Sequence, residues 1–393
     1  MKYIFDERSE KNHPNEPMLS ATQSEGVILQ SKYQGRVVVV NTGFEGLKLV
    51  KDGDFVIHLR SFQGGIEYAY DRGIISSAYT ILNLKYPEYS AYYKRLFKSI
   101  SFIDLLKICV TGIREGQNIN YSKLKQFFIP LPPLSEQHSI VSFLDAKCGK
   151  IDEWVTKKQK EVEHLQELKQ RVIADAVTRG LHPHVKMKAT NIPWLKEIPE
   201  HWEVKPIRAI LRENTDKTET GDEELLSLSQ YTGISRKKDA AKIGMFEAES
   251  TVGYKKVHPG QFVMNIMLAW NGSYAVSEFE GIISPAYCVF DFISKDEKMY
   301  YNYLWRLSMY QGAFKTESRG IIDSRLRLYP NKFLPFPTIC PPIEEQKQIV
   351  SYLDAKCSKI DKLIANIAKE IERIKEYKQR LISDVVTGQI KVC

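Results

Sequence analysis

A 20-residue segment occurs twice in this chain, and it limits the possible folds more than any other feature. PPLSEQHSIVSFLDAKCGKI runs from Pro132 to Ile151, and PPIEEQKQIVSYLDAKCSKI runs from Pro341 to Ile360, 209 residues later. Of the 20 aligned positions 14 are identical, and the changes are mostly mild, such as Phe143 to Tyr352. A duplication at this spacing predicts a chain built from two similar halves.

Each copy continues into a region where apolar residues recur at steps of three, four or seven over about five heptads, which predicts two long helices paired as a coiled coil. The seam residues that we assign are Ile140, Leu144, Ile151, Val155, Val162, Leu165, Val172 and Ala176 in the first copy, and Ile349, Leu353, Ile360, Ile364, Ile371, Ile374, Leu381 and Val385 in the second. Lys158, Lys169 and Lys378 interrupt this seam, and polar seam positions can fix the register of a pair.

The sequence also indicates where these helices begin and end. Each Pro-Pro pair lies just before a helix, where the missing N–H groups cost little. Ser135 is a natural N-cap for the first helix, whereas Glu344 at the same place in the second is a weaker one. Gly180 and Pro183 predict the end of the first helix. At about 40 residues each, the helices span about 60 Å, and their matching lengths predict that they pack antiparallel within one chain.

The repeat extends upstream more weakly, through segments that have the character of strands. VKDGDFVI (50–57) corresponds to VHPGQFVM (257–264), and RGIISSAYTI (72–81) corresponds to EGIISPAYCV (280–289). Short β-branched or aromatic runs bounded by Gly or Asp favour strands. We therefore predict an α+β fold, with two mixed α/β domains at 1–131 and 182–340 and two spacer helices at 132–181 and 341–393.

The two halves differ mainly in their loops. QSEGVILQSKYQGRVVVVNTGFEG follows Thr22 in the first half, and QYTGISRKKDAAKIGMFEAESTVGY follows Ser229 in the second. Divergent loops on a shared scaffold are typical of two binding specificities in one chain.

These residues resemble a known family. The two Pro-Pro segments, IPWLKEIPEHWEVKPI (192–207) and the C-terminal LISDVVTGQIKV are similar to conserved regions of the DNA-specificity subunit of type I restriction-modification enzymes, and the resemblance covers essentially the whole chain. It implies two target-recognition domains that each read half of a bipartite, asymmetric site in double-stranded DNA, spaced by paired antiparallel helices. It also implies docking of two methyltransferase subunits and of restriction subunits, which would bind S-adenosylmethionine, ATP and magnesium, while this chain binds no cofactor.

The first half departs from the family pattern. It begins at Met1 roughly where Ile207 stands in the second half, so the IPWLxxIPEHWEV lead-in has no counterpart before the first domain. This leaves open a truncated start, a gene model that begins late, or a silent copy from a recombination cassette.

Motifs for catalysis are missing from the sequence. We find no [NDS]-P-P-[FYW] motif of amino-group methylation, no G-x-x-x-x-G-K-[ST] phosphate loop and no C-x-x-C pair. We therefore expect a non-catalytic subunit without a metal. A net charge of +8 is compatible with nucleic acid, and the absence of a signal peptide or membrane-length apolar run favours the cytoplasm.

Two other classes of protein remain open at this point. One is a coiled-coil scaffolding protein without a nucleic-acid role, which would have no use for two divergent domains. The other is a single-chain restriction or methylation enzyme, against which the missing motifs count.

Candidate DNA contacts are chosen by residue type and by position in loops, since Arg, Lys, Asn and Gln read base edges and bind phosphates. The alternative for each is an ordinary solvated surface residue, and Trp270 is equally suited to a core. The candidates are Lys32, Tyr33, Arg36, Arg60, Gln63, Arg114, Gln117 and Asn118 in the first domain, and Arg236, Lys237, Lys238, Trp270, Asn271, Arg319, Arg325 and Arg327 in the second.

Overall fold

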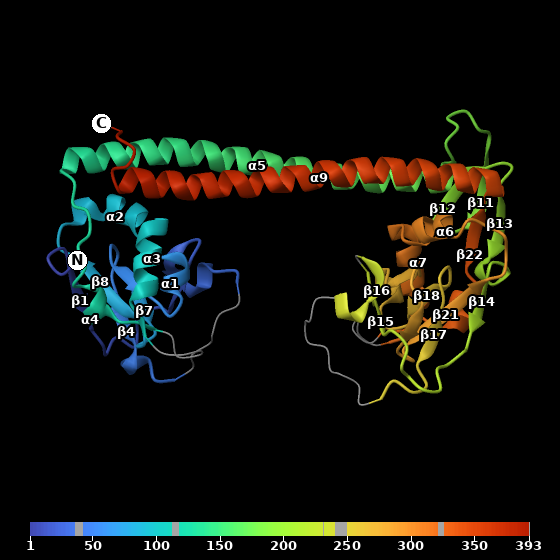
Figure 1. The fold of residues 1–393 in the computed structure, drawn as a ribbon, viewed down its shortest axis with the longest axis horizontal. Coiled ribbons are helices and arrows are strands. Elements are labelled where there is room, and N and C mark those ends of the chain that lie inside the picture. The colour runs from blue at the N-terminus through green and yellow to red at the C-terminus, as the bar shows by residue number, and fades with distance from the viewer. Residues whose placement is uncertain (36–41, 112–117, 231, 240–249, 321–325, 393) are drawn as a thin grey trace. The chain divides into compact units, whose positions relative to one another are not determined.

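The structure of the protein is a computed structural model, and it describes all residues except 36–41, 112–117, 231, 240–249, 321–325 and 393. The described residues form two compact units (Figure 1). The first is Met1–Lys160 with Asn366–Cys393, and the second is Glu161–Ala365. Each unit therefore combines a globule with part of each of the two long helices.

The first globule is built around a four-stranded antiparallel sheet with the order β1-β8-β5-β6. Its strands are β1 (Phe5–Arg8), β5 (Phe55–Ile57), β6 (Glu67–Tyr68) and β8 (Thr80–Leu84). One face of the sheet packs on α2 (Ser90–Leu96) and α3 (Ile100–Ile108). In that core the ring centroids of Phe5, Phe55 and Phe97 lie 5.1 to 5.5 Å apart, a spacing at which aromatic rings attract one another.

Two-stranded ladders and short helices flank this sheet. The ladders are β2 (Leu19–Thr22) with β3 (Gly26–Leu29), β4 (Lys48–Val50) with β7 (Gly73–Ile75), and β9 (Val110–Thr111) with β10 (Asn118–Ile119). The short helices are α1 (Ser61–Gly64) and α4 (Tyr121–Leu124). The turn before β3 requires glycine, because Gly26 has a φ of +78° and a Cβ there would lie 2.6 Å from the Tyr68 carbonyl oxygen.

The second globule repeats this plan. Its four-stranded sheet has the order β14-β21-β18-β19, which matches β1-β8-β5-β6 strand for strand. The strands of this sheet are β14 (Leu211–Asn214), β18 (Phe262–Asn265), β19 (Tyr274–Val276) and β21 (Tyr287–Phe292). The two-stranded ladders are β15 (Leu226–Ser229) with β16 (Gly233–Arg236) and β17 (Lys255–Val257) with β20 (Gly281–Ile283). The helices are α6 (Lys298–Trp305), α7 (Ser308–Glu317) and α8 (Pro330–Phe333). The predicted fold of two repeated mixed domains is confirmed.

The second unit has further strands that lead into its sheet. A hairpin of β11 (Met187–Ile192) and β12 (Leu195–Pro199) follows the first long helix. Next, β13 (Glu203–Pro206) pairs antiparallel with β22 (Pro337–Cys340). β12 and β13 lie in the IPWLKEIPEHWEVKPI segment, residues 192–207.

The long helices are α5 (Leu134–Arg179, 46 residues) and α9 (Ile343–Val386, 44 residues). In the first unit, Ile140 and Leu144 of α5 share a core with Leu381 of α9. In the second unit, Ala176 of α5 shares a core with Ile349 of α9. The start of each helix thus packs on the end of the other, and the predicted antiparallel pairing is confirmed.

Tyrosines of the globules hold the ends of these helices at matching positions. The hydroxyl of Tyr92 donates to the Val386 carbonyl at 2.7 Å, and that of Tyr300 donates to the Val177 carbonyl at 2.8 Å. Tyr92 and Tyr300 are 208 residues apart, and the two valines are 209 apart. Each globule therefore packs on the end of a helix through the same contact.

The lysines that interrupt the seam have partners on the facing helix. Lys169 Nζ lies 2.7 Å from an Asp361 carboxylate oxygen, and Lys378 Nζ lies 2.6 Å from one of Asp152. The two pairs are related by the offset of 209. Such ion pairs favour one antiparallel register over its neighbours.

The predicted N-cap is wrong. α5 begins at Leu134, so Ser135 lies inside its first turn. Instead Gln137 donates its backbone N–H to the Pro133 carbonyl at 3.0 Å and its side-chain amide to that of Pro132 at 2.9 Å. Gln346 makes the same two bonds to Pro342 and Pro341 in α9. The chain becomes helical directly after the prolines because a buried glutamine ties the first turn to them.

Candidate nucleic-acid interface

In the first unit, the predicted DNA contacts lie on turns around the sheet. Lys32 ends a 3₁₀ turn, η1 (Gln30–Lys32), and Tyr33 follows it; Arg60 precedes α1, Gln63 lies in α1, and Asn118 begins β10. All are exposed except Tyr33, which is half-buried. Arg36, Arg114 and Gln117 lie outside the described residues.

The charge of Lys32 is already paired within the protein. Its ammonium lies 2.8 Å from Asp71, which also accepts the backbone N–H of Leu29 at 3.0 Å. These two hydrogen bonds, that from Lys32 first, hold the pKa of Asp71 below its usual range. Lys32 therefore fixes the turn after β3, and a phosphate would compete with Asp71 for it.

In the second unit, the predicted basic residues have partners of several kinds. Arg236 is the last residue of β16, and its guanidinium lies over the Phe279 ring, 5.6 Å from the ring centroid. Lys237 and Lys238 lie in η6 (Lys237–Asp239). The Lys238 ammonium forms an ion pair with Glu224 at 3.0 Å.

Two further candidate positions of the second unit lie close to each other. Arg319 and Arg327 form an antiparallel backbone bridge with N···O distances of 3.0 and 2.9 Å. Arg325 lies outside the described residues.

Trp270 and Asn271 lie together in η7 (Ala269–Asn271). Trp270 is half-buried, and its indole donates to the Met267 carbonyl at 3.2 Å. The ammonium of Lys315 lies 4.8 Å from the Trp270 ring. Asn271 is exposed.

Gln63 and Asn271 occupy equivalent positions, 208 residues apart. Other polar or glycine residues around them are related by an offset of 207 or 208. We call these two sets the turn cluster: Gln23, Gln63, Gly64, Lys98 and Lys107 in the first unit, and Gln230, Asn271, Gly272, Arg306 and Lys315 in the second.

A single cation joins two turns in each unit. In the first, Lys98 Nζ donates to the carbonyl of Gly64 at 3.0 Å and to that of Gln23 at 3.4 Å. In the second, Arg306 Nη2 donates to the carbonyl of Gln230 at 2.6 Å and approaches that of Gly272 at 3.5 Å. The turn after β2 is thereby fixed to the end of α1, and the turn after β15 to the residue that follows η7.

The charge balance of this cation differs between the units. Lys98 also lies 2.5 Å from Glu67, whose side chain is buried and whose Oε2 has no hydrogen-bond partner among the described atoms. In the first unit, Glu67 pairs with Val56 on the neighbouring strand. The equivalent pair in the second unit is Ala275 with Val263, so an alanine stands where the first unit has a glutamate. Among the described residues, no carboxylate pairs with Arg306, and burial lowers the pKa of its guanidinium.

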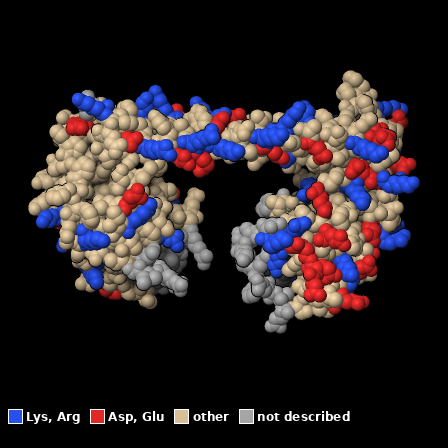
Figure 2. Space-filling view, in the orientation of Figure 1, with Lys and Arg blue, Asp and Glu red and all other residues tan. Residues whose placement is uncertain are grey.

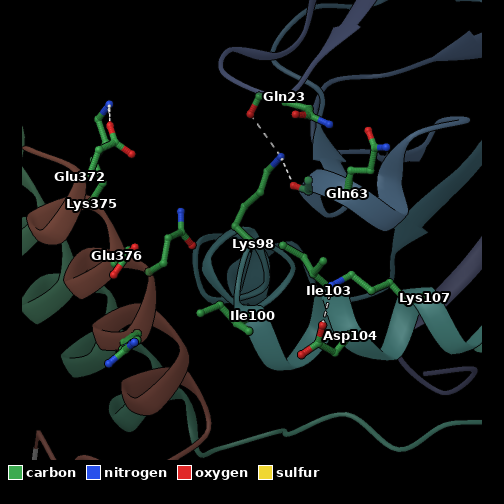
Figure 3. A pocket seen from close by; sticks show the side chains of 13 residues that line it. Gln23, Gln63, Lys98, Ile100, Ile103, Asp104, Lys107, Glu372, Lys375 and Glu376 are labelled. Atoms are coloured by element: carbon green, nitrogen blue, oxygen red, sulfur yellow. Dashed lines mark hydrogen bonds and ion pairs between the residues drawn. The ribbon is translucent and has the colours of Figure 1, made fainter. Parts of the chain in front are cut away.

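The amide side chains of the turn cluster are accessible. Gln23 and Gln63 are exposed, and Figure 3 shows them beside Lys98 on one wall of a pocket of about 670 Å³, with Glu372 and Glu376 of α9 on the other. In the second unit, Asn271 Nδ2 donates to Gln230 Oε1 at 2.5 Å. Amides on fixed turns can donate to phosphate oxygens or to base edges.

Most of the turn cluster was not predicted from the sequence. Gln23, Lys98, Lys107, Gln230, Arg306 and Lys315 are absent from the candidates above. A signal was available, because YYKRLFKS (92–99) aligns with YYNYLWRL (300–307) and puts Lys98 opposite Arg306.

Charge is distributed unevenly over the surface. Figure 2 shows Lys and Arg interspersed with Asp and Glu along α5 and α9, while acidic side chains gather over the β14–β17 side of the second globule. That acidic face disfavours contact with phosphates. Within the described ranges, no three His, Cys, Asp or Glu side chains are grouped to hold a metal, and no described helix is long and apolar enough to cross a membrane.

Comparison with known proteins gives a consistent result. The family model for the type I restriction modification DNA specificity domain matches residues 1–164 and 199–373. Two specificity subunits from Methanocaldococcus jannaschii are similar to this chain. The subunit of the type I restriction enzyme MjaVIII is 27% identical over 370 residues, which cover 88% of this chain and 80% of the relative. The subunit of MjaX is 24% identical over 321 residues, which cover 78% of this chain and 68% of the relative.

A solved structure shares the fold. It was determined to explain complex assembly and conformational transition of the type I R-M system, and its chain superposes with a TM-score of 0.64 at 16% identity, over 98% of this chain and 97% of its own. On the family match, which covers both globules and most of both long helices, this chain belongs to the type I restriction modification DNA specificity family and is a specificity subunit of a type I restriction-modification system.

Proposed function

We propose that the chain reads a bipartite, asymmetric site in double-stranded DNA, one half with the first globule and the other half with the second. The observation that carries this proposal is the repeated sheet, β1-β8-β5-β6 and β14-β21-β18-β19, with different sequences in the loops between matching strands. Two equal scaffolds with unlike loops suit two unlike half-sites.

Positions that differ and positions that match have different roles in this proposal. A residue type shared by both globules cannot distinguish two half-sites, so the turn cluster contacts what the half-sites share, the sugar–phosphate backbone. Gln63 and Asn271 donate to phosphate oxygens, while Lys98 and Arg306 position the turns. Base readout falls to residues without a match, among them Arg236 at the end of β16 and Lys238 in η6.

Catalysis belongs to partner subunits in this proposal. The chain docks two methyltransferase subunits and then restriction subunits, which carry S-adenosylmethionine, ATP and magnesium, and it works in the cytoplasm. The lack of methylation and phosphate-loop motifs in the sequence supports this division. A scaffolding role without DNA is not favoured, because the matched family is one of DNA specificity.

Exchange of one globule tests the proposal. Residues 20–130 are replaced by the equivalent segment of a relative with a different target, and the DNA methylated by the assembled complex is sequenced. We expect one half-site to change and the other to stay. An exchange of 227–339 is the matched experiment and should change the opposite half-site. Alteration of both half-sites by one exchange would contradict the proposal.

A further inference from the structure

A buried histidine begins the turn that carries Gln63 of the turn cluster, residues 58–64, which we call the Gln63 turn. His58 directly follows β5 and is 9% exposed. Its backbone N–H donates to Ser61 Oγ at 2.9 Å, and its ring atom Nδ1 accepts the backbone N–H of Arg60 at 3.2 Å. His58 therefore holds the start of the Gln63 turn from both its backbone and its ring.

The bond from Arg60 ties the turn to one protonation state of the ring. A histidine nitrogen accepts a hydrogen bond only while it carries no proton, so neutral His58 has its single ring proton on Nε2. A second proton would add to Nδ1, and the N–H groups of Nδ1 and Arg60 would then point at each other. Histidine is the side chain that changes charge between about pH 5 and 8. The contact with Arg60 thus belongs to the neutral form.

The other ring nitrogen faces a carboxylate that suits the charged form. His58 Nε2 lies 3.7 Å from Glu67 Oε1, which is beyond hydrogen-bond distance. Neither Nε2 nor Glu67 Oε2 has a hydrogen-bond partner among the described atoms. The Glu67 side chain is buried, and its Oε1 already lies 2.5 Å from Lys98. An imidazolium would find an acceptor in Glu67 after a small movement, and an opposite charge at this distance favours the charged form.

Other groups around the histidine ring come from several elements. Tyr79, directly before β8, has its ring centroid 6.1 Å from that of the histidine. Burial raises the pKa of the Tyr79 phenol, so it stays neutral while a histidine titrates, and Lys48 donates to the Tyr79 carbonyl at 2.7 Å. Lys98, on Glu67, opposes an imidazolium, whereas the carboxylate favours it. Arg60 is exposed, so solvent screens its charge.

The second unit forms the equivalent turn with a side chain that does not titrate. Asn265 lies 207 residues after His58, and Met267 lies the same distance after Arg60. Asn265 Oδ1 accepts the backbone N–H of Met267 at 3.0 Å, which is the bond that Nδ1 makes in the first unit. An amide oxygen remains an acceptor at every pH. Ala275 stands where the first unit has its buried glutamate, so these positions hold no partner for a cation either.

We propose that His58 is a positioning residue that holds the Gln63 turn only while its ring is neutral. In acid, Nδ1 takes up one proton from solvent, the ring donates from Nε2 to Glu67, and the bond from Arg60 is lost. The added charge is held by Glu67 inside the globule, and the turn is released. The consequence for DNA rests on the proposed function: in acid the first globule binds its half-site less tightly, while the turn of the second globule is unchanged.

The first test needs no DNA. Backbone amide signals of the full chain are followed by NMR between about pH 5 and 8, in the parent and in His58→Asn, which copies the second unit. In the parent, we expect the amides of Gln63 and Gly64 to move with the same midpoint as the ring signals of His58, and in His58→Asn to stay in place. Those of Asn271 and Gly272 are the internal control and should not move. No movement in the parent, or equal movement in His58→Asn, overturns the proposal.

A second variant tests the part played by the carboxylate and keeps His58 in place. Glu67→Gln removes the negative charge that favours the imidazolium, so the movement of the Gln63 amide should have its midpoint at a lower pH than in the parent. A midpoint that stays the same would overturn the pairing of His58 with Glu67.

DNA binding separates this proposal from the proposed function. The affinity of the assembled complex for a duplex with both half-sites is measured at the two ends of the same pH range. Loss of one phosphate contact should make the parent about fivefold more sensitive to acid than His58→Asn. If the Gln63 turn titrates by NMR but both complexes respond equally to acid, the role of His58 stands and the phosphate contact of Gln63 in the proposed function is wrong.

Discussion

Lys98 and Arg306 hold equivalent turns, and in the part of the chain that the structure describes Lys98 alone does so next to a buried carboxylate. Lys98→Met would remove the ammonium 2.5 Å from the buried Glu67 carboxylate and leave it only His58 Nε2, at 3.7 Å, among the described residues. We therefore expect urea unfolding to show a loss of about 3 kcal/mol. Lys98→Met with Glu67→Leu should recover part of this loss. Arg306→Met is the control at the matching position, where no carboxylate is left behind, and it should cost less. A double variant as unstable as the single one would refute this explanation.

The accessible amides of the turn cluster lead to a prediction about affinity. Removing one hydrogen bond to a phosphate costs about 1 kcal/mol, so Gln63→Ala or Asn271→Ala should weaken DNA binding by the assembled complex about fivefold. The loss should be equal for target and non-target duplexes, because a phosphate contact carries no sequence information. Gln159→Ala on the exposed side of α5 is the control. A change in preferred bases would instead assign these amides to base readout.

Among single residues, the sequence indicated which exposed polar side chains lie near turns, but not which of them are already paired within the protein. Gln63 and Asn271 were chosen as exposed amides in turns, and the structure gives them equivalent positions. Lys32 and Lys238 were chosen for charge, yet each is paired with a carboxylate, Asp71 and Glu224. Pairing of this kind joins residues 39 and 14 positions apart, and a local pattern does not show it.

The long helices could be predicted at the scale of elements because their evidence is local and repeated. Apolar spacing gave both helices and the antiparallel pair. It did not give Ile367, which is 6% exposed and lies outside the assigned seam. It also misplaced the start of α5, because the tie from Gln137 to the prolines is a side-chain contact rather than a propensity.

The seam provides a prediction with a matched control on the same helix turn. Ile360 is 7% exposed, whereas Leu363 is 51% exposed. Ile360→Lys would bury a charge without a partner and should lower the free energy of unfolding by several kcal/mol, roughly 3. Leu363→Lys should change it by less than about 0.5 kcal/mol. Thermal melts of the two variants check this, and equal melting temperatures would show that Ile360 does not stabilise the helix pair.

For the whole molecule, the first prediction concerns the division of labour. The purified chain should transfer no methyl group from S-adenosylmethionine to DNA, because its sequence has no methylation motif. Activity should arise when two methyltransferase subunits are added, and the control is those subunits without this chain. Methyl transfer by the chain alone, with partner contamination excluded by mass spectrometry, would overturn the assignment of catalysis to the partners.

The second prediction concerns the spacing of the half-sites. Both long helices contribute to both units, so the length of the helix pair should set the number of unspecified base pairs between the half-sites. Removing 156–162 from α5 and the equivalent 365–371 from α9 takes away one heptad from each helix, about 10 Å. At about 3.4 Å per base pair this corresponds to roughly three base pairs.

Sequencing of the methylated DNA should therefore show a spacer shortened by that amount, or no methylation if the lost rotation takes one globule off its groove. Deleting 156–162 alone is the control, because it shortens α5 but not α9, so the Lys169–Asp361 and Lys378–Asp152 pairs can no longer form together and methylation should be lost. An unchanged spacer after the paired deletion would mean that the helices do not measure the distance between the half-sites.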